Sequence, residues 1–137
     1  MARFRLLEHT ADIGIEAAGE SLADLFQQTA FGLRQVITSS AISLQQERRV
    51  SITAEDREEL LVNWLSELLY LFESELFLAA EIDIESIDER NLLARLRGEV
   101  VDPTKIDIER EVKAITYHQI KVEEHTDGWR AQVFVDL

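Results

Sequence analysis

One segment of this 137-residue chain carries a wide apolar stripe at helical spacing. Large side chains recur there three or four positions apart, the repeat of one helix face: Leu60, Leu61, Trp64, Leu65, Leu68, Leu69 and Phe72. Thr53 followed by Asp56 is typical of a helix start just upstream of this stripe. Because so wide a stripe must be buried, we predict a helix at the centre of the core.

A first, shorter helix and several strands are predicted around it. Ser21 and Asp24 mark a helix start, and apolar residues then follow at helical spacing up to Val36. The other segments are rich in Val, Ile and aromatic residues, as strands are: RFRLLE, IGIEA, RRVSIT, EIDIESI, NLLARLRGEVV, VKAITYHQIKVE and WRAQVFVDL. The turns IDERN and HTDGW should join the last four into two antiparallel hairpins. We therefore expect a single α+β domain over residues 1–137, with two amphipathic helices packed on an antiparallel or mixed β-sheet of about seven strands.

Charge and composition narrow the classes of partner. The formal net charge is −13, so the field around the chain should repel phosphate backbones and favour basic protein surfaces or multivalent cations. Solubility alone would explain the same charge. The chain has no cysteine, which excludes disulfides, zinc–thiolate sites and thiol catalysis. No apolar run is long enough to cross a bilayer and no secretory signal precedes the domain, so we expect a cytoplasmic protein without a membrane partner.

Acidic residues near both ends of the chain are candidate metal ligands. Asp12 heads an apolar strand, and His9 before it could bind a metal, orient Asp12 or bond a backbone carbonyl. At the other end, the Asp136 side chain and the Leu137 α-carboxylate bring two hard oxygen groups together, which are ligands that calcium prefers. The alternative is that Asp136 only makes the chain end soluble.

Two further charged residues and one loop could serve a functional site. Lys113 belongs to the predicted strand Glu111–Val122, and its amine either lies in water or faces an acidic site or a phosphate. Glu67 lies among leucines in the second helix, on its solvent edge or pointing into a polar pocket. The polar loop Asp102–Glu111 is the best candidate for a mobile or partner-facing segment. The motifs of α/β-hydrolases, P-loop and dinucleotide-binding proteins and zinc proteases do not occur.

Five segments together resemble the archease family over the whole chain: HTADIGI, LLVNWLSELL, GEVVD, VKAITYH and VFVDL. The resemblance implies a small α+β protein that activates an enzyme and is not one itself. Its partner in that family is the GTP-dependent, metal-dependent RNA ligase that joins tRNA halves in splicing and acts in RNA repair. The family protein promotes guanylylation of the ligase's active-site histidine, allows many turnovers and carries an acidic metal site, commonly occupied by calcium. Nucleic acid would then be contacted only through the ligase.

Matching the family's motifs assigns roles to particular residues. Asp12 is the Asp of HTAD, Lys113 the Lys of KAITYH, and Asp136 the terminal acid before Leu137. If the two ends of the chain meet, their carboxylates need a cation between them, so Asp12, Asp136 and Leu137 are the predicted ligands of a divalent cation, calcium by expectation. Lys113 would offset the remaining charge or meet nucleotide phosphates.

Three other positions complete the comparison with the family. Glu67 and His9 are carried over as residues of the activating surface. Many family members carry a histidine in the loop after the Gly-Glu pair, whereas Ile106 stands near that place in this chain, so we assign that loop no ligand.

Two rival functions remain open on the sequence alone. A metal-dependent phosphoesterase would hydrolyse phosphate esters without any ligase. A plain binding module or chaperone-like holdase would protect unfolded proteins and would not depend on Lys113.

Overall fold

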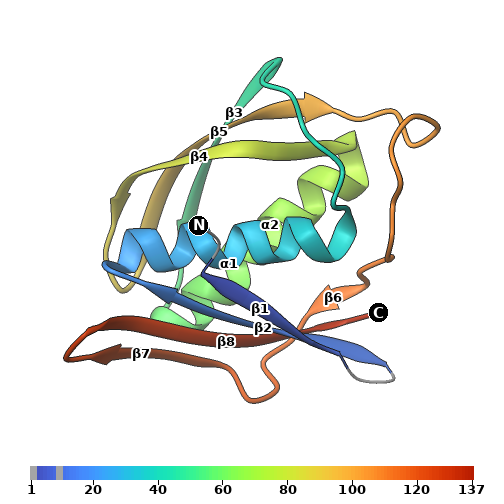
Figure 1. Cartoon of the computed structure of the whole chain (residues 1–137). Helices are drawn as coiled ribbons and strands as arrows, with labels where there is room; N and C mark the ends of the chain where they lie inside the picture. Colours follow the sequence, from blue (N-terminus) through green and yellow to red (C-terminus); the bar gives the residue numbers. More distant parts are fainter. Residues whose placement is uncertain (1–2, 9–10) are drawn as a thin grey trace.

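Two antiparallel sheets enclose two helices in the computed structural model, which describes residues 3–8 and 11–137 (Figure 1). The described residues form ten elements in chain order: β1 Phe4–Glu8, β2 Asp12–Gly19, α1 Leu22–Ile37, β3 Gln46–Thr53, α2 Arg57–Glu75, β4 Phe77–Ile87, β5 Asn91–Val100, β6 Ala114–Ile115, β7 Lys121–His125 and β8 Gly128–Asp136. The predicted α+β class with two helices is confirmed. The single predicted sheet is instead two sheets, one on each side of the helix layer.

The larger sheet places the N-terminal hairpin β1–β2 beside the C-terminal strand β8. Its strand order is β1-β2-β8-β6, and β7 also pairs with β8. The smaller sheet has the order β3-β5-β4. Both predicted hairpins, β4–β5 and β7–β8, are confirmed. Gly128 in the second turn has a φ of 134°, a conformation that glycine tolerates best.

The first residues of the two helices were predicted correctly for α1 but not for α2. Ser21 caps α1 as predicted, since its side chain accepts a hydrogen bond from the Asp24 N–H at 3.0 Å. The cap of α2 is Asp56, which accepts from the Glu59 N–H at 2.8 Å. Thr53 is not the helix start that the sequence suggested, because it is the last residue of β3 and pairs with Asn91 across the sheet.

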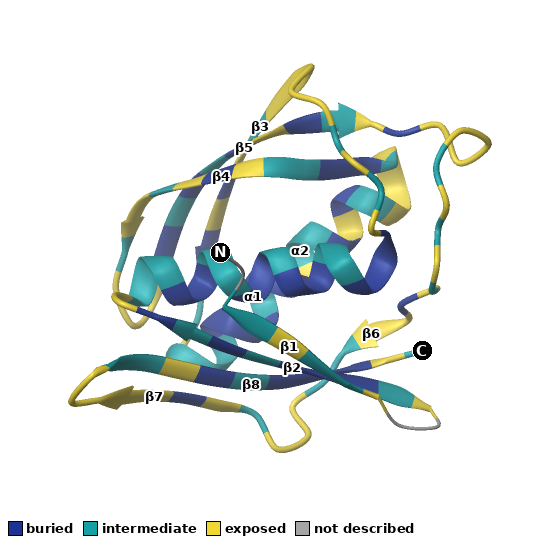
Figure 2. Cartoon of the chain, in the orientation of Figure 1, coloured by how far each residue is buried: buried dark blue, intermediate teal, exposed yellow. Residues whose placement is uncertain are grey.

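The central helix buries most of its predicted apolar stripe, although Leu68 and Phe72 are only half-buried. Trp64 is fully buried, and its indole N–H donates to the Phe26 carbonyl of α1 at 3.0 Å. Leu60, Leu61 and Leu65 are also fully buried. Figure 2 shows the buried residues gathered in the helices and in the strands that face them. Neither helix is long and apolar enough to cross a membrane.

The predicted strand Glu111–Val122 is wrong as a continuous element. Only Ala114 and Ile115 form β6, and the chain then turns before β7. The turn is closed by a hydrogen bond from the Ile120 N–H to the Tyr117 carbonyl at 3.3 Å, and Gln119 has a positive φ of 51°. Lys113 therefore lies just before a two-residue strand and not within a long one.

Loop 102–111 is free of strands, as predicted, but its second half is fastened to the end of α1. The Thr38 hydroxyl donates to the Asp107 carbonyl at 2.6 Å, and the Glu109 N–H donates to the Ile37 carbonyl at 2.8 Å. The Glu109 carboxylate accepts from the Ser39 hydroxyl at 2.5 Å and from the Ser39 N–H at 2.6 Å. These bonds favour a fixed loop over the mobile one that its polarity suggested.

The attachment of this loop is expected to weaken in acid. The hydrogen bonds from the Ser39 hydroxyl, and then from its N–H, lower the pKa of Glu109. A lowered folded-state pKa means that the stabilisation is present above the unfolded-state pKa and is lost as the pH falls through the folded-state value. The backbone amide shift of Ser39 should therefore titrate with Glu109 in an NMR series from about pH 6 to pH 3. The titration should vanish in Glu109→Gln, and a flat Ser39 shift in the unsubstituted protein would contradict the prediction.

Candidate functional site

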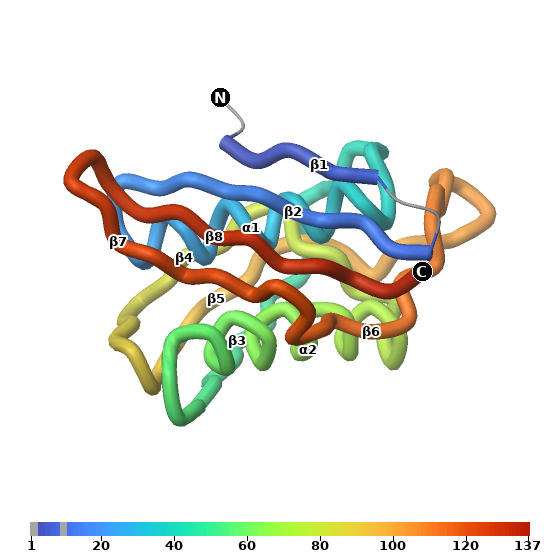
Figure 3. The backbone as a smooth tube through the Cα atoms, turned by 90° about the horizontal axis from the view of Figure 1, so that it is seen from below, coloured from blue at the N-terminus to red at the C-terminus, as the bar shows by residue number. Residues whose placement is uncertain are grey.

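The start of β2 and the end of β8 lie side by side at one end of the larger sheet (Figure 3). Asp12 is the direct cross-strand partner of Asp136. Directly opposed residues of antiparallel strands point to the same face, with Cβ atoms about 4.5–5.5 Å apart. The predicted meeting of the two ends of the sequence is thus confirmed, and it places two carboxylates next to each other.

The acidic pair lies on the face of the sheet that points away from the helices. Val133 and Val135 of β8 are fully buried on the helix side, as the alternation of a strand requires. Asp136 is exposed and Asp12 is half-buried. An ion or a partner can therefore reach the pair from solvent.

Main-chain hydrogen bonds hold the end of β8 from both sides. The Leu137 N–H donates to the Ala11 carbonyl at 3.1 Å, and the Lys113 N–H donates to the Asp136 carbonyl at 2.8 Å. Ala114 of β6 is the other cross-strand partner of Asp136. The ordered strand end is explained by these bonds, so it does not by itself require a cation.

The two carboxylates have no protein cation beside them within residues 3–8 and 11–137. The side chains of Asp12 and Asp136 make no hydrogen bond or ion pair in that part of the chain. Lys113 reaches the site through its main chain, and its exposed side chain makes no contact with either acid there. Like charges directly opposed in a sheet repel each other, and a hard divalent cation removes that repulsion. The donor set therefore fits such an ion.

The other predicted site residues are spread more widely. Glu67 is half-buried in α2, which packs against β6. His9 and Thr10 lie outside the described residues, so the roles proposed for His9 stay predictions. No group of three His, Asp or Glu side chains close enough to hold a metal occurs among the residues described. Leu137 is half-buried, and its main-chain carboxylate stays the third predicted ligand. Ile106, which stands where many family members have a histidine, packs against the core.

An aromatic pair adjoins the acids, and nothing in the sequence patterns had indicated it as a pair. Phe134 is the cross-strand partner of Gly14, and a Cβ built on Gly14 would come within 2.9 Å of the Phe134 ring. His118 meets the same ring edge-on, with the centroids 5.7 Å apart. The available signal was Gly14 itself, because glycine inside a strand often marks a close approach.

The Archease protein family model matches residues 4–137. The chain belongs to the archease family. The archease of Methanosarcina mazei is 40% identical to it over 140 residues, covering 98% of this chain and 96% of that relative. The functional roles assigned to Asp12 and Asp136 of this archease stay predictions.

Two solved structures resemble this archease. The solution structure of Methanobacterium thermoautotrophicum protein 1598 has a TM-score of 0.81 and 32% identity, covering 100% of both chains. The crystal structure of an archease, possible chaperone, from Thermotoga maritima has a TM-score of 0.65 and 23% identity, covering 97% of this chain and 96% of that one. The second likeness supports the fold alone. None of these relatives carries the name of an enzyme.

Proposed function

We propose that this archease activates a GTP-dependent, metal-dependent RNA ligase of tRNA splicing and RNA repair, and that it is not itself an enzyme. It would promote guanylylation of the ligase's active-site histidine and so allow many rounds of ligation. Membership of the archease family supports the class of function. The observation that carries the proposal to particular residues is the cross-strand pairing of Asp12 with Asp136.

The acidic pair would hold a divalent cation, which we propose to be calcium. Calcium takes six to eight oxygen ligands. Asp12 and Asp136 supply side-chain carboxylates, and the main-chain carboxylate of Leu137 would add another oxygen group. Water or oxygen atoms of the partner would complete the shell. The bound cation would supply positive charge near the active site of the ligase, where the ligase binds its triphosphate and its own metal.

The net charge of −13 supports separate roles for the ligase and the archease. The ligase would bind the RNA, while the acidic archease would approach a basic cleft of the ligase with an electrostatically accelerated on-rate. Lys113, whose main-chain N–H donates to the Asp136 carbonyl, would meet a phosphate of the nucleotide or offset unneutralised charge. Glu67 and His9 are further candidates for this surface.

A multiple-turnover ligation assay tests the proposal. With RNA in excess over its cognate ligase, adding the archease should convert a single round of ligation into many rounds. Asp12→Ala and Asp136→Ala should each lower this stimulation about 10- to 100-fold, the usual cost of disturbing a metal site. Transfer of labelled guanylate from GTP to the ligase should fall in parallel, because that is the step being promoted.

The matched control is Glu124→Gln, which removes one exposed acid from β7 and should leave stimulation unchanged. Full stimulation by both aspartate variants would refute the role of the acidic pair. Phosphoesterase activity without ligase would contradict the non-enzymatic assignment. Protection of unfolded proteins that is insensitive to Lys113→Ala, together with no effect on ligation, would favour the chaperone-like alternative.

A further inference from the structure

A hollow of about 500 Å³ lies at the other end of β8 from the acidic pair. It is bounded by the starts of both helices, the β4–β5 turn and Trp129 near the start of β8. Trp129 precedes Asp136 by seven positions, which is roughly 23 Å along a strand. The hollow is therefore separate from the candidate metal site.

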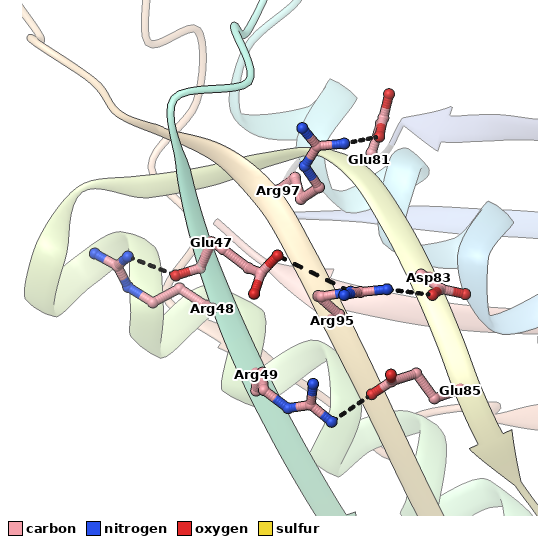
Figure 4. Close-up of polar contacts among 8 residues, drawn as sticks. All are labelled: Glu47, Arg48, Arg49, Glu81, Asp83, Glu85, Arg95 and Arg97. Carbon is pink, nitrogen blue, oxygen red and sulfur yellow. Dashed lines mark hydrogen bonds and ion pairs between the residues drawn. The ribbon is translucent and has the colours of Figure 1, made fainter.

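Two arginines in this hollow lack the carboxylate partner that most other arginines of the described chain have. Figure 4 shows the usual pattern on the outer face of the smaller sheet, where arginines pair with acids across the strands. Among the described residues only Arg34, Arg57 and Arg90 have no carboxylate partner within ion-pair distance, and Arg34 donates to the Ala79 carbonyl at 3.0 Å. The other two line the same hollow.

Arg57 has an unused donor as well as an unpaired charge. Its guanidinium lies 5.0 Å from the centroid of the Trp129 ring. Its Nε is buried and has no hydrogen-bond partner in the described structure. The Nη groups of Arg57 also donate no hydrogen bond among the described residues, so an acceptor oxygen that reached them from the hollow would gain a charge-assisted hydrogen bond.

The aspartate that shares the turn with Arg90 already accepts hydrogen bonds there. Asp88 accepts hydrogen bonds from the backbone N–H groups of Arg90 and Asn91, both at 2.8 Å. These two bonds, in that order, lower the pKa of Asp88, and the charge of Arg90 contributes least. The Arg90 guanidinium therefore makes no hydrogen bond within residues 3–8 and 11–137. Glu89 also lines the hollow, so its charge opposes an anion there.

The starts of both helices lie at the hollow, but acids already occupy their positive ends. Leu22 is the first residue of α1 and Arg57 the first of α2; the first turn of α1 carries Asp24, and that of α2 carries Glu58 and Glu59. The hollow on the outer face of the larger sheet is bigger, at about 600 Å³, but its arginines are already ion-paired: Arg3, Arg5 and Arg130.

We propose that this hollow binds the phosphate group of a small molecule through Arg57 and Arg90. Two guanidinium charges match a phosphate dianion, and each guanidinium can present paired N–H donors to phosphate oxygens. Trp129 and Leu22 supply an apolar wall for the body of the ligand. This proposal does not depend on the ligase or on the metal site.

NMR titrations of the full chain test it. Inorganic phosphate, AMP and acetate are added at constant ionic strength, and the indole N–H signals of Trp129 and Trp64 are followed, with Trp129→Phe giving the assignment. Phosphate or AMP should move the Trp129 signal saturably and leave Trp64 unmoved, because Trp64 is buried and bonded to Phe26. Tighter binding of AMP than of phosphate identifies a nucleotide site, and equal binding identifies a free-phosphate site.

Arginine variants test whether phosphate or AMP binds in the hollow. Arg57→Gln and Arg90→Gln should each weaken Kd about tenfold or more, the cost of losing charge-assisted hydrogen bonds. Arg49→Gln removes the same charge from the Glu85 pair on the smaller sheet and should leave Kd within about twofold, since exposed charges far from a ligand are screened. Thermal unfolding of each variant shows that the fold is kept. The proposal is overturned by no saturable shift, by binding of acetate alone, or by equal losses in all three variants.

Discussion

Calcium is expected to raise the unfolding midpoint temperature (Tm) of this archease, and the increase should disappear in Asp136→Asn. A ligand that binds only the folded state stabilises it by about 2.7 kcal/mol at a hundred times its Kd. That corresponds to roughly 5–12 °C in Tm for a domain of this size. Asp136 is expected to be a ligand because it is directly opposed to Asp12 across the sheet, on the solvent-facing side.

The effect of the same substitution on stability should be reversed when a chelator removes divalent ions. Without a cation, Asp12 and Asp136 are like charges directly opposed in a sheet, a pairing that costs about 0.2–1 kcal/mol. Asp136→Asn or Asp12→Asn should therefore be slightly more stable than the unsubstituted chain in chelator and less stable in excess calcium. Measuring Tm in both conditions shows whether the order reverses.

Asp107→Asn is the matched control for this reversal. Asp107 is an exposed acid whose side chain makes no hydrogen bond or ion pair among the residues described, so its loss should leave the calcium response intact. A Tm that does not respond to calcium in the unsubstituted chain would exclude the proposed site. An equal response in Asp136→Asn and in the control would place the calcium elsewhere.

Local sequence signals predicted those parts of the fold that depend on neighbouring residues. The Ser21 cap, the buried stripe around Trp64 and the Asp-Gly turn before β8 all form as their patterns indicated. The local pattern placed the start of the second helix at Thr53, but Thr53 pairs with Asn91 in the sheet and Asp56 caps the helix instead. Such long-range pairing is absent from the local pattern.

The same limit explains the division into two sheets and the break before β7. A run such as VKAITYHQIKVE has the composition of one strand, yet two of its residues pair with the end of β8 and its last three pair with the first half of β8. The turn between them needs a positive φ at Gln119, a residue that carries no turn signal of its own.

The candidate site was predictable only in part. Residue chemistry identified Asp12 and Asp136 as possible ligands separately, but the meeting of their strands came from the family resemblance. Strand register between the two ends of a chain is set by the whole fold, so periodicity could not supply it. The unpaired state of Arg57 and Arg90 was likewise invisible, because ion-pair partners are known only once the chain is folded.

Gly98→Ala is expected to destabilise the fold strongly, although it adds only one methyl group. Gly98 lies in β5, the central strand of the smaller sheet, opposite the irregular part of β4. A Cβ at this position would lie 1.9 Å from the Leu78 carbonyl oxygen and 2.8 Å from the Ala79 Cα. Both are backbone atoms of the neighbouring strand, so relief requires the β4–β5 pairing itself to move. We expect a loss of about 3 kcal/mol or more in the free energy of unfolding, measured by urea titration.

Gly14→Ala is the matched comparison for Gly98→Ala, because it adds the same methyl group to another buried strand glycine. Its closest contact would be the Phe134 ring at 2.9 Å, a side chain that can shift toward solvent, so we expect a loss of about 1 kcal/mol. A Gly98→Ala variant as stable as Gly14→Ala would mean that the bulge in β4 yields easily. The larger loss at Gly98 would instead show that close backbone approach, more than side-chain packing, fixes the register of the smaller sheet over the helices.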